Sequence, residues 1–165
     1  MKIASIQAHP YSFKGNKTIA VASDHGGFNL KSKVVEHLKE KGYKVNDIGC
    51  DSVKSCNYPD FAHNVAQKVT KGEADLGILV CGTGIGMSIA ANKHEGIRAS
   101  AVENAFSAKA TKAHNDSNIL CLGERVLGDG VALDIVDNWL NTEFEGGRHQ
   151  NRIDLIEPKN FFLAV

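Results

Sequence analysis

Short apolar runs alternate with longer amphipathic segments along this chain, and this alternation constrains the fold more than any other feature. The runs are rich in branched residues, which predicts strands. The segments between them repeat apolar residues at intervals of three and four positions, which predicts helices. Because a helix between two strands commonly connects parallel strands, the pattern predicts an α/β domain with a parallel sheet.

The alternation predicts five strands and five principal helices. The strands cover residues 18–23, 43–49, 74–81, 96–102 and 117–123. The helices cover residues 28–42, 59–72, 84–93, 104–115 and 128–141, and a short helix follows near the C-terminus. The expected architecture is a single-domain, Rossmann-like three-layer sandwich, with a five-stranded parallel sheet flanked by helices.

The length of 165 residues suits one domain with a hydrophobic core. We expect residues 1–16 to form an N-terminal extension, 17–156 the folded domain and 157–165 a C-terminal tail. Within the extension, the segment IASIQA has the composition of an additional strand. The first residues resemble neither a signal peptide nor a transit peptide. No run approaches the ~20 apolar residues that span a bilayer, so we expect no membrane association.

Charge and cysteine usage restrict the partners and the compartment. Nineteen basic and nineteen acidic residues give a formal net charge of zero, whereas nucleic-acid binders usually carry a basic excess. The cysteines form no Cys-x-x-Cys pair, which argues against a disulfide scaffold and favours a reducing cytoplasm. We expect Cys121 to lie in the core, and Cys50 and Cys56 to be incidental surface residues. No cluster has metal-ligand spacing, so we expect no metal and no cofactor.

Polar residues gather where the predicted strands begin and end. Ligands of parallel α/β sheets bind beyond the carboxyl ends of the strands. Asp24 and His25 follow the first strand, Cys81 ends the third, and His114 and Asn115 lie between the fourth and the fifth. We therefore expect a ligand site assembled from these residues together with Gly123–Arg125 and the tail residues Arg148, His149 and Arg152.

The loop VCGTGIGMS, residues 80–88, has the composition of an anion hole. Its glycines let backbone N–H groups approach a ligand, and the helix that follows points the positive end of its dipole at the same place. The loop lacks the lysine of a Walker A motif, and Gly82, Gly84 and Gly86 do not match the dinucleotide spacing. A tight strand-to-helix turn is the alternative interpretation, but a thiol and a hydroxyl inside the loop favour a functional one.

Cys81 and the histidines each have two interpretations. A free cysteine is commonly a small buried hydrophobe, but a helix N-terminus favours the thiolate, which acts as a base or nucleophile. His25 and His114 suit a general acid or an anion contact. His149 lies between two arginines, and its role stays ambiguous.

The tail arginines, Arg148 and Arg152, are four residues apart and would share one face of a helix. An exposed basic face is one interpretation. The other is a phosphate clamp formed with Arg125. A neighbouring subunit can supply a tail arginine to such a pocket.

These motifs give the chain a resemblance to a known family. The segments SDHGGF, NYPDFA, CGTGIGMSIAANK, GIRA, AHNDSN, GERV and EGGRHQNR have the order and spacing of the type B ribose-5-phosphate isomerases, from about Lys17 to about Ile156. The wider group includes the galactose-6-phosphate isomerase subunits. The resemblance implies an aldose–ketose isomerase domain at residues 17–156. It would interconvert D-ribose 5-phosphate and D-ribulose 5-phosphate through an enediolate, in the non-oxidative branch of the pentose phosphate pathway.

The resemblance also implies catalytic roles. Cys81 matches the base that takes the proton from C2, where some members use a glutamate elsewhere. His114 matches the group that opens the furanose ring. The anion hole for the enediolate is formed by Thr83 and the backbone of Gly82, Gly84, Ile85 and Gly86.

The resemblance implies that the remaining matched residues bind substrate. Asp24, Asn115 and Tyr58 match contacts to the sugar hydroxyls and ring. The residues that match the phosphate-binding set are His25, Arg125, Arg148 and Arg152. The family's site lies at the interface of a homodimer, and a tetramer stays open.

Two alternatives stay open as well. A hexose 6-phosphate isomerase, acting on allose or galactose 6-phosphate, would differ in pocket size, which a sequence does not reveal. A non-catalytic sugar-phosphate sensor would use the same fold, but it would need neither a base nor a ring-opening histidine.

Overall fold

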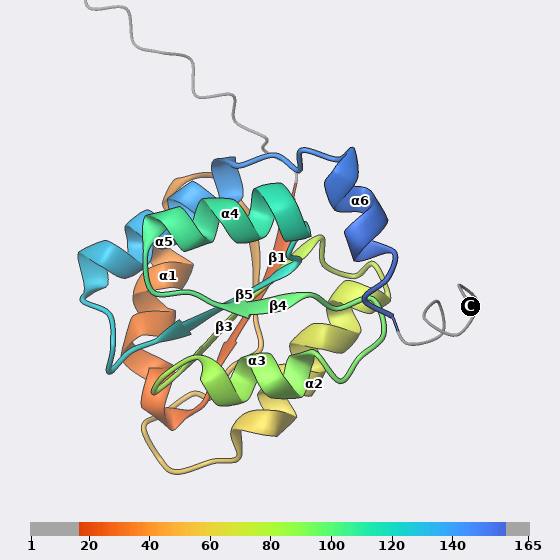
Figure 1. The fold of residues 1–165 in the computed structure, drawn as a ribbon. Helices are drawn as coiled ribbons and strands as arrows, with labels where there is room; N and C mark the ends of the chain where they lie inside the picture. Colours follow the sequence, from red (N-terminus) through yellow and green to blue (C-terminus); the bar gives the residue numbers. More distant parts are fainter. Residues whose placement is uncertain (1–16, 158–165) are drawn as a thin grey trace, which may run out of the picture.

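Five short strands pair in parallel to form the central sheet of this chain, whose residues 17–157 are described by a computed structural model (Figure 1). The sheet order is β2-β1-β3-β5-β4. Strands β3 and β5 are buried along their whole length, which explains why they read as continuous apolar runs. The strands are β1 (Thr18–Ser23), β2 (Lys44–Asp47), β3 (Leu76–Cys81), β4 (Ala99–Ala101) and β5 (Ile119–Gly123).

Each predicted helix is present, with small shifts at its ends. The α-helices are α1 (Phe28–Glu40), α2 (Tyr58–Thr70), α3 (Ile85–Ala91), α4 (Ala105–Asn115), α5 (Asp129–Asn141) and α6 (Arg148–Ile153). A short 3₁₀ turn, η1 (His25–Gly27), precedes α1. The predicted strand 96–102 is shortened to β4, because a turn in which the Ile97 N–H donates to the His94 carbonyl occupies its start.

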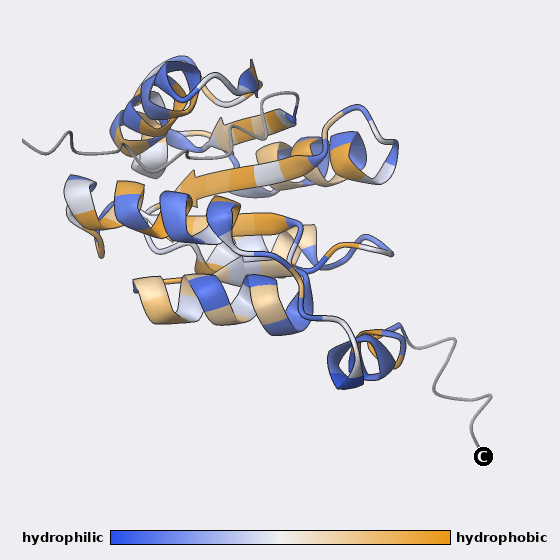
Figure 2. Cartoon of the chain, turned by 90° about the horizontal axis from the view of Figure 1, so that it is seen from above, coloured by the Kyte–Doolittle hydropathy of each residue, from blue (hydrophilic) through white to orange (hydrophobic). Residues whose placement is uncertain are grey.

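Helices cover both faces of the sheet, as the three-layer prediction requires. Ile19 and Val21 of β1 pack with α1, α4 and α5, whereas Ala20 and Ala22 pack with α2 and α3. Figure 1 shows these two helical layers on opposite sides of the strands. In Figure 2 the strands are mostly hydrophobic, and hydrophilic turns alternate with hydrophobic ones along the helices. The single-domain α/β architecture is therefore confirmed.

The chain changes direction across the sheet between β1 and β3. It passes from β1 to the neighbouring β2 on one side, and then returns to β3 on the other side of β1. Such a switch point leaves a crevice at the carboxyl ends of the two strands, where α/β proteins bind ligands. Among residues 17–157, no helix is long and apolar enough to cross a bilayer. The segment IASIQA lies outside the described residues.

Candidate active site

The turn after β1 brings Asp24 and His25 to the switch point. The Asp24 carboxylate accepts a hydrogen bond from the Gly26 N–H at 2.9 Å, which caps η1. A Cβ on Gly27 would lie 2.5 Å from the Val80 carbonyl carbon. Glycine is therefore needed there, because the turn packs directly on the backbone of β3.

The glycine loop follows β3 at the same edge. Cys81 is the last residue of the strand, and its sulfur accepts a hydrogen bond from the Gly84 N–H at 3.1 Å. Gly84 has φ of 78° and precedes α3 directly. The first backbone bond of this helix runs from the Ser88 N–H to the Gly84 carbonyl. The preceding N–H groups of Ile85 and Gly86 thus lack intrahelical acceptors and can face an anion beside the thiol.

Tyr58 and Arg125 border this loop. A Cβ on Gly86 would lie 2.9 Å from the Tyr58 ring. The Arg125 N–H donates to the Gly82 carbonyl at 3.1 Å, and the Arg125 side chain lies over Gly82. The structure therefore brings together, at one edge, the predicted residues Asp24, His25, Tyr58, Cys81, Gly82, Thr83, Gly84, Ile85, Gly86 and Arg125.

Glu124 connects the end of β3 to the start of α1 at this edge, and the sequence analysis assigned it no role. Its N–H donates to the Cys81 carbonyl at 2.9 Å. Its carboxylate accepts hydrogen bonds from the Leu30 N–H at 2.9 Å and the Asn29 amide at 3.0 Å. The Glu124 side chain thus accepts hydrogen bonds from the first turn of α1. The N-cap residue of this helix, Gly27, has no side chain that could do so.

Two cysteines expected at the surface, Cys50 and Cys56, are more buried than predicted, whereas Cys121 lies in the core as expected. Cys121 is fully buried and burial raises the pKa of its thiol, so the core assignment is confirmed. Cys50 is 8% exposed, so its surface assignment was wrong. Cys56 is half-buried, burial raises the pKa of its thiol, and its N–H donates to His25 Nδ1 at 3.3 Å. The loop before α2 therefore supports His25.

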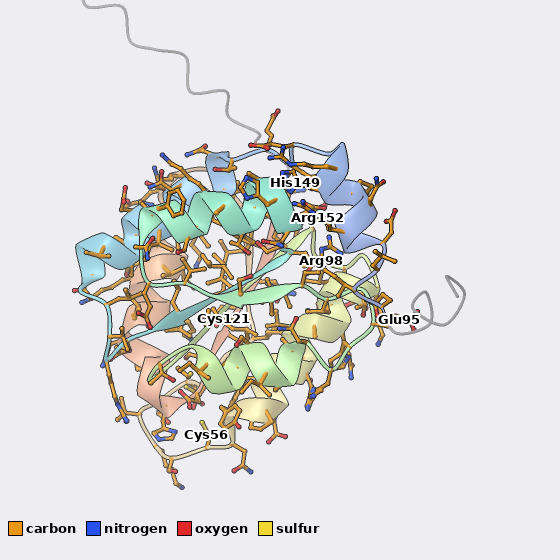
Figure 3. All side chains as sticks on the ribbon, in the orientation of Figure 1. Cys56, Glu95, Arg98, Cys121, His149 and Arg152 are labelled. Carbon is orange, nitrogen blue, oxygen red and sulfur yellow. The ribbon has the colours of Figure 1, made fainter. Side chains whose placement is uncertain are left out.

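The remaining predicted residues form a second group. His114 and Asn115 end α4, and α6 carries Arg148 and Arg152. The helical arrangement of these two arginines is confirmed. Figure 3 shows His149 and Arg152 at a different end of the molecule from Cys56. A cavity of about 360 Å³ is lined by His114, Asn115, His149, Arg152, Ile153 and Ile156.

The two groups lie at opposite ends of the parallel strands, one at the carboxyl edge of the sheet and the other at the amino edge. Cys81 is in register with Gly123, the last residue of β5, whereas His114 precedes Ile119, the first. Strand β5 advances about 3.3 Å per residue, so it separates the two edges by about 13 Å. Within one chain His114 and Asn115 therefore lie away from the carboxyl-edge site, because α4 ends where β5 begins.

His114 stacks on His149 in this second group. Their ring centroids lie 4.3 Å apart with an interplanar angle of 5°. The Glu145 carboxylate lies 3.8 Å from His114 Nε2 and 3.5 Å from His149 Nε2. Burial, followed by the charges of His114 and Arg148, lowers the pKa of His149. The ambiguous histidine of the sequence is therefore a neighbour of the predicted ring-opening residue.

Comparison with known proteins matches this arrangement to one family. A family model described as Ribose/Galactose Isomerase matches residues 19–156. The chain belongs to the ribose/galactose isomerase family. Among its relatives, ribose-5-phosphate isomerase B of Escherichia coli is 50% identical over 140 residues, covering 85% of this chain and 94% of that protein. A putative sugar phosphate isomerase, YwlF of Bacillus subtilis, is 54% identical, covering 86% and 98%.

Solved structures of family members share the fold. Ribose-5-phosphate isomerase B of Clostridium thermocellum superposes with a TM-score of 0.86 at 50% identity, covering 89% of this chain and 99% of that chain. The Mycoplasma genitalium enzyme, solved with bound ribulose-5-phosphate, gives a TM-score of 0.83 at 44% identity, covering 90% and 97%. The family resemblance expected from the sequence motifs is confirmed.

Proposed function

We propose that this chain is an aldose–ketose isomerase that interconverts D-ribose 5-phosphate and D-ribulose 5-phosphate. One observation carries the proposal: the Cys81 thiol lies at the switch point of the sheet, beside N–H groups of the glycine loop that have no acceptor within the helix. A base next to an anion hole is what proton abstraction beside a carbonyl requires. The family and the ribulose-5-phosphate-bound relative support the substrate.

The reaction transfers a proton between C2 and C1 of the open-chain sugar. Cys81 as thiolate takes the proton from C2, and the N–H groups of the loop stabilise the oxyanion of the enediolate. The same sulfur then returns the proton to C1. The Gly84 N–H, which donates to the sulfur, stabilises the negative charge that the sulfur carries before it takes the C2 proton and again after it has returned the proton to C1.

The polar groups at both edges bind and open the sugar in this proposal. His114 opens the furanose ring, and Asp24, Tyr58 and Asn115 contact the sugar. The phosphate is distant from C1 and C2, so its binding energy holds the sugar in reactive geometry. The phosphate is held by His25, Arg125, Arg148 and Arg152.

A second copy of the chain completes the site in this proposal. About 13 Å of sheet separates Cys81 from His114 within one chain. Two-fold symmetry lets the α4–α6 end of one chain cover the glycine loop of the other, which forms two equivalent sites per homodimer. The four cysteines are free, which suits the reducing cytoplasm that we propose for the enzyme.

Turnover by the purified chain tests the activity. We expect ribose 5-phosphate to be converted faster than allose 6-phosphate, and Cys81→Ala to lose at least ~10²-fold in kcat while it still binds substrate. The matched control is Cys121→Ala, which removes a buried thiol from the same face of the sheet and should keep most activity. Preference for allose 6-phosphate would mean that the enzyme is a hexose 6-phosphate isomerase. Binding without turnover by the wild type would indicate a sensor.

Mixing two inactive variants tests the shared site. Cys81→Ala and His114→Ala should each be inactive as homodimers. After unfolding and joint refolding in equal amounts, about half of the dimers combine one chain of each kind, and one of their two sites is intact. We therefore expect about a quarter of wild-type activity. If the mixture stays inactive although mixed dimers form, both residues act within one chain and the shared site is wrong.

A further inference from the structure

The Arg125 side chain reaches across the candidate site from the segment that follows β5. A Cβ on Gly82 would lie 3.4 Å from Arg125 Nε, and a Cβ on Gly26 would lie 3.6 Å from Arg125 Nη2. The side chain therefore spans from the glycine loop to the turn after β1. Within residues 17–157 its guanidinium donates no hydrogen bond and forms no ion pair, so its donors face outward toward an anion.

The place of this guanidinium depends on where its backbone lies. Two backbone hydrogen bonds attach the segment to the end of β3. The Glu124 N–H donates to the Cys81 carbonyl at 2.9 Å, and the Arg125 N–H donates to the Gly82 carbonyl at 3.1 Å. These bonds fix the segment against the glycine loop only, and a second attachment is needed to fix it against the turn after β1.

The Glu124 carboxylate supplies that second attachment. One of its oxygens accepts from the Leu30 N–H at 2.9 Å, and the other accepts from the Asn29 amide at 3.0 Å. Both donors belong to the first turn of α1 and lie 94 and 95 positions away in the sequence. A carboxylate is favourable there, because the first N–H groups of a helix lack intrahelical acceptors and carry the positive end of the dipole.

The same bonds connect Arg125 to His25. The turn η1, which carries His25, runs directly into α1. A side chain at Gly27 cannot cap this helix, because a Cβ there would lie 2.5 Å from the Val80 carbonyl carbon. The cap therefore comes from Glu124, the residue next to Arg125. Glu124 thus holds the two segments that carry His25 and Arg125 in a fixed relation.

We infer that Glu124 is a positioning residue for phosphate binding and acts through Arg125 and His25. The inference rests on the proposed function, in which these two side chains hold the phosphate of the sugar. Two roles of the carboxylate differ in sign. By charge alone it repels a nearby phosphate, so its removal would tighten binding. As an anchor it aligns two phosphate ligands, so its removal weakens binding.

Calorimetric titration of Glu124→Ala and Glu124→Gln with inorganic phosphate separates these roles. Both variants lose the charge. Glutamine keeps an acceptor for the Leu30 N–H, and its amide donates to Asn29 once the Asn29 amide turns over. We expect the dissociation constant of phosphate to rise at least about fivefold in Glu124→Ala and to stay unchanged or fall in Glu124→Gln. With ribose 5-phosphate, KM of Glu124→Ala should rise more than kcat falls.

The matched control is Asp75→Ala. The Asp75 carboxylate also accepts a backbone hydrogen bond, from the Thr18 N–H at 2.7 Å, but it does so where β1 begins, at the amino edge. Its loss should lower the free energy of unfolding without changing phosphate binding. Asn29→Ala removes one of the two anchoring bonds from an exposed residue. It should weaken phosphate binding in the same direction but less, which keeps the test valid if Glu124→Ala fails to fold.

The outcomes separate this inference from the proposed function. The inference is wrong if Glu124→Ala binds phosphate as tightly as the wild type does. It is also wrong if Glu124→Gln or Asp75→Ala weakens binding as much as Glu124→Ala. The phosphate titration needs no turnover. A wild type that binds phosphate with the expected pattern but converts no ribose 5-phosphate would therefore reject the proposed function and support the role of Glu124.

Discussion

At the scale of single residues, Lys31 shows how a buried charge supports the candidate site. Its side chain is 5% exposed, and its ammonium donates to the two Asp47 carboxylate oxygens at 3.0 and 2.9 Å. It also donates to the Cys50 carbonyl at 3.0 Å. The lysine thus joins α1 and β2 to the loop whose Cys56 N–H contacts His25.

Asp47→Ala should destabilise the protein more than Lys31→Met does. The aspartate variant leaves an ammonium buried with one carbonyl partner. Breaking a fully buried pair costs about 3–5 kcal/mol, and because Asp47 is 37% exposed we expect about 1–3 kcal/mol. Lys31→Met removes the charge and keeps the apolar stem, so we expect less than about 1 kcal/mol. Urea unfolding measures both, and the reverse order would contradict this account.

At the scale of elements, the site depends on how closely backbone segments approach one another. A Cβ on Gly123 would lie 2.7 Å from the Thr83 Cα, so the glycine loop rests directly on the end of β5. The turn after β1 rests on β3 in the same way, through Gly27. These contacts place the loop by sterics, and a side chain at either position would displace it.

Gly27→Ala and Gly130→Ala should have opposite effects. The methyl group at position 27 meets backbone atoms of Val80 and Cys81 at 2.5–2.8 Å, so we expect about 1–3 kcal/mol of destabilisation. It should also lower kcat, because the Cys81 loop moves. Position 130 lies in α5 with nothing within 4 Å of a Cβ, so alanine should stabilise by about 0.5–1 kcal/mol. Thermal unfolding and turnover test both, and equal stability of the two variants would refute the steric argument.

At the scale of the whole molecule, buried titratable groups limit the stable pH range. Burial lowers the pKa of His94, which bonds His63 of α2, and that of His149. Burial raises the pKa of Cys121 and Cys56. Each group favours its neutral form in the folded chain. Stability is therefore lost toward both acid and alkaline pH.

The free energy of unfolding should be greatest between about pH 6.5 and 9, the ordinary pKa values of histidine and cysteine. Below that window the unfolded chain binds protons that His94 and His149 resist in the folded state. Above it the unfolded chain releases protons that Cys121 and Cys56 retain. His94→Gln should reduce the loss of unfolding free energy toward acid pH, and Cys121→Ala should reduce the loss toward alkaline pH. Urea unfolding across pH measures the slopes, and unchanged slopes would contradict this assignment.

Most of the fold was predictable from the sequence, because periodicity and glycine placement act over short stretches of chain. The strands, the helices and the groups that follow β1 and β3 were recognised in this way. The helical pairing of Arg148 with Arg152 was recognised as well. Motif order along the chain also identified the family, since it depends on sequence alone.

Only the tertiary structure decided which groups meet. The sequence by itself places His114 near a strand, but the direction of α4 against β5 puts it at the edge opposite Cys81. Cys50 and Lys31 look like surface residues in sequence, yet packing between α1 and the loop after β2 buries them. The stack of His114 on His149 joins residues 35 positions apart (149 − 114). Such contacts depend on how whole elements pack, because local periodicity carries no information about which distant segment lies beside a residue.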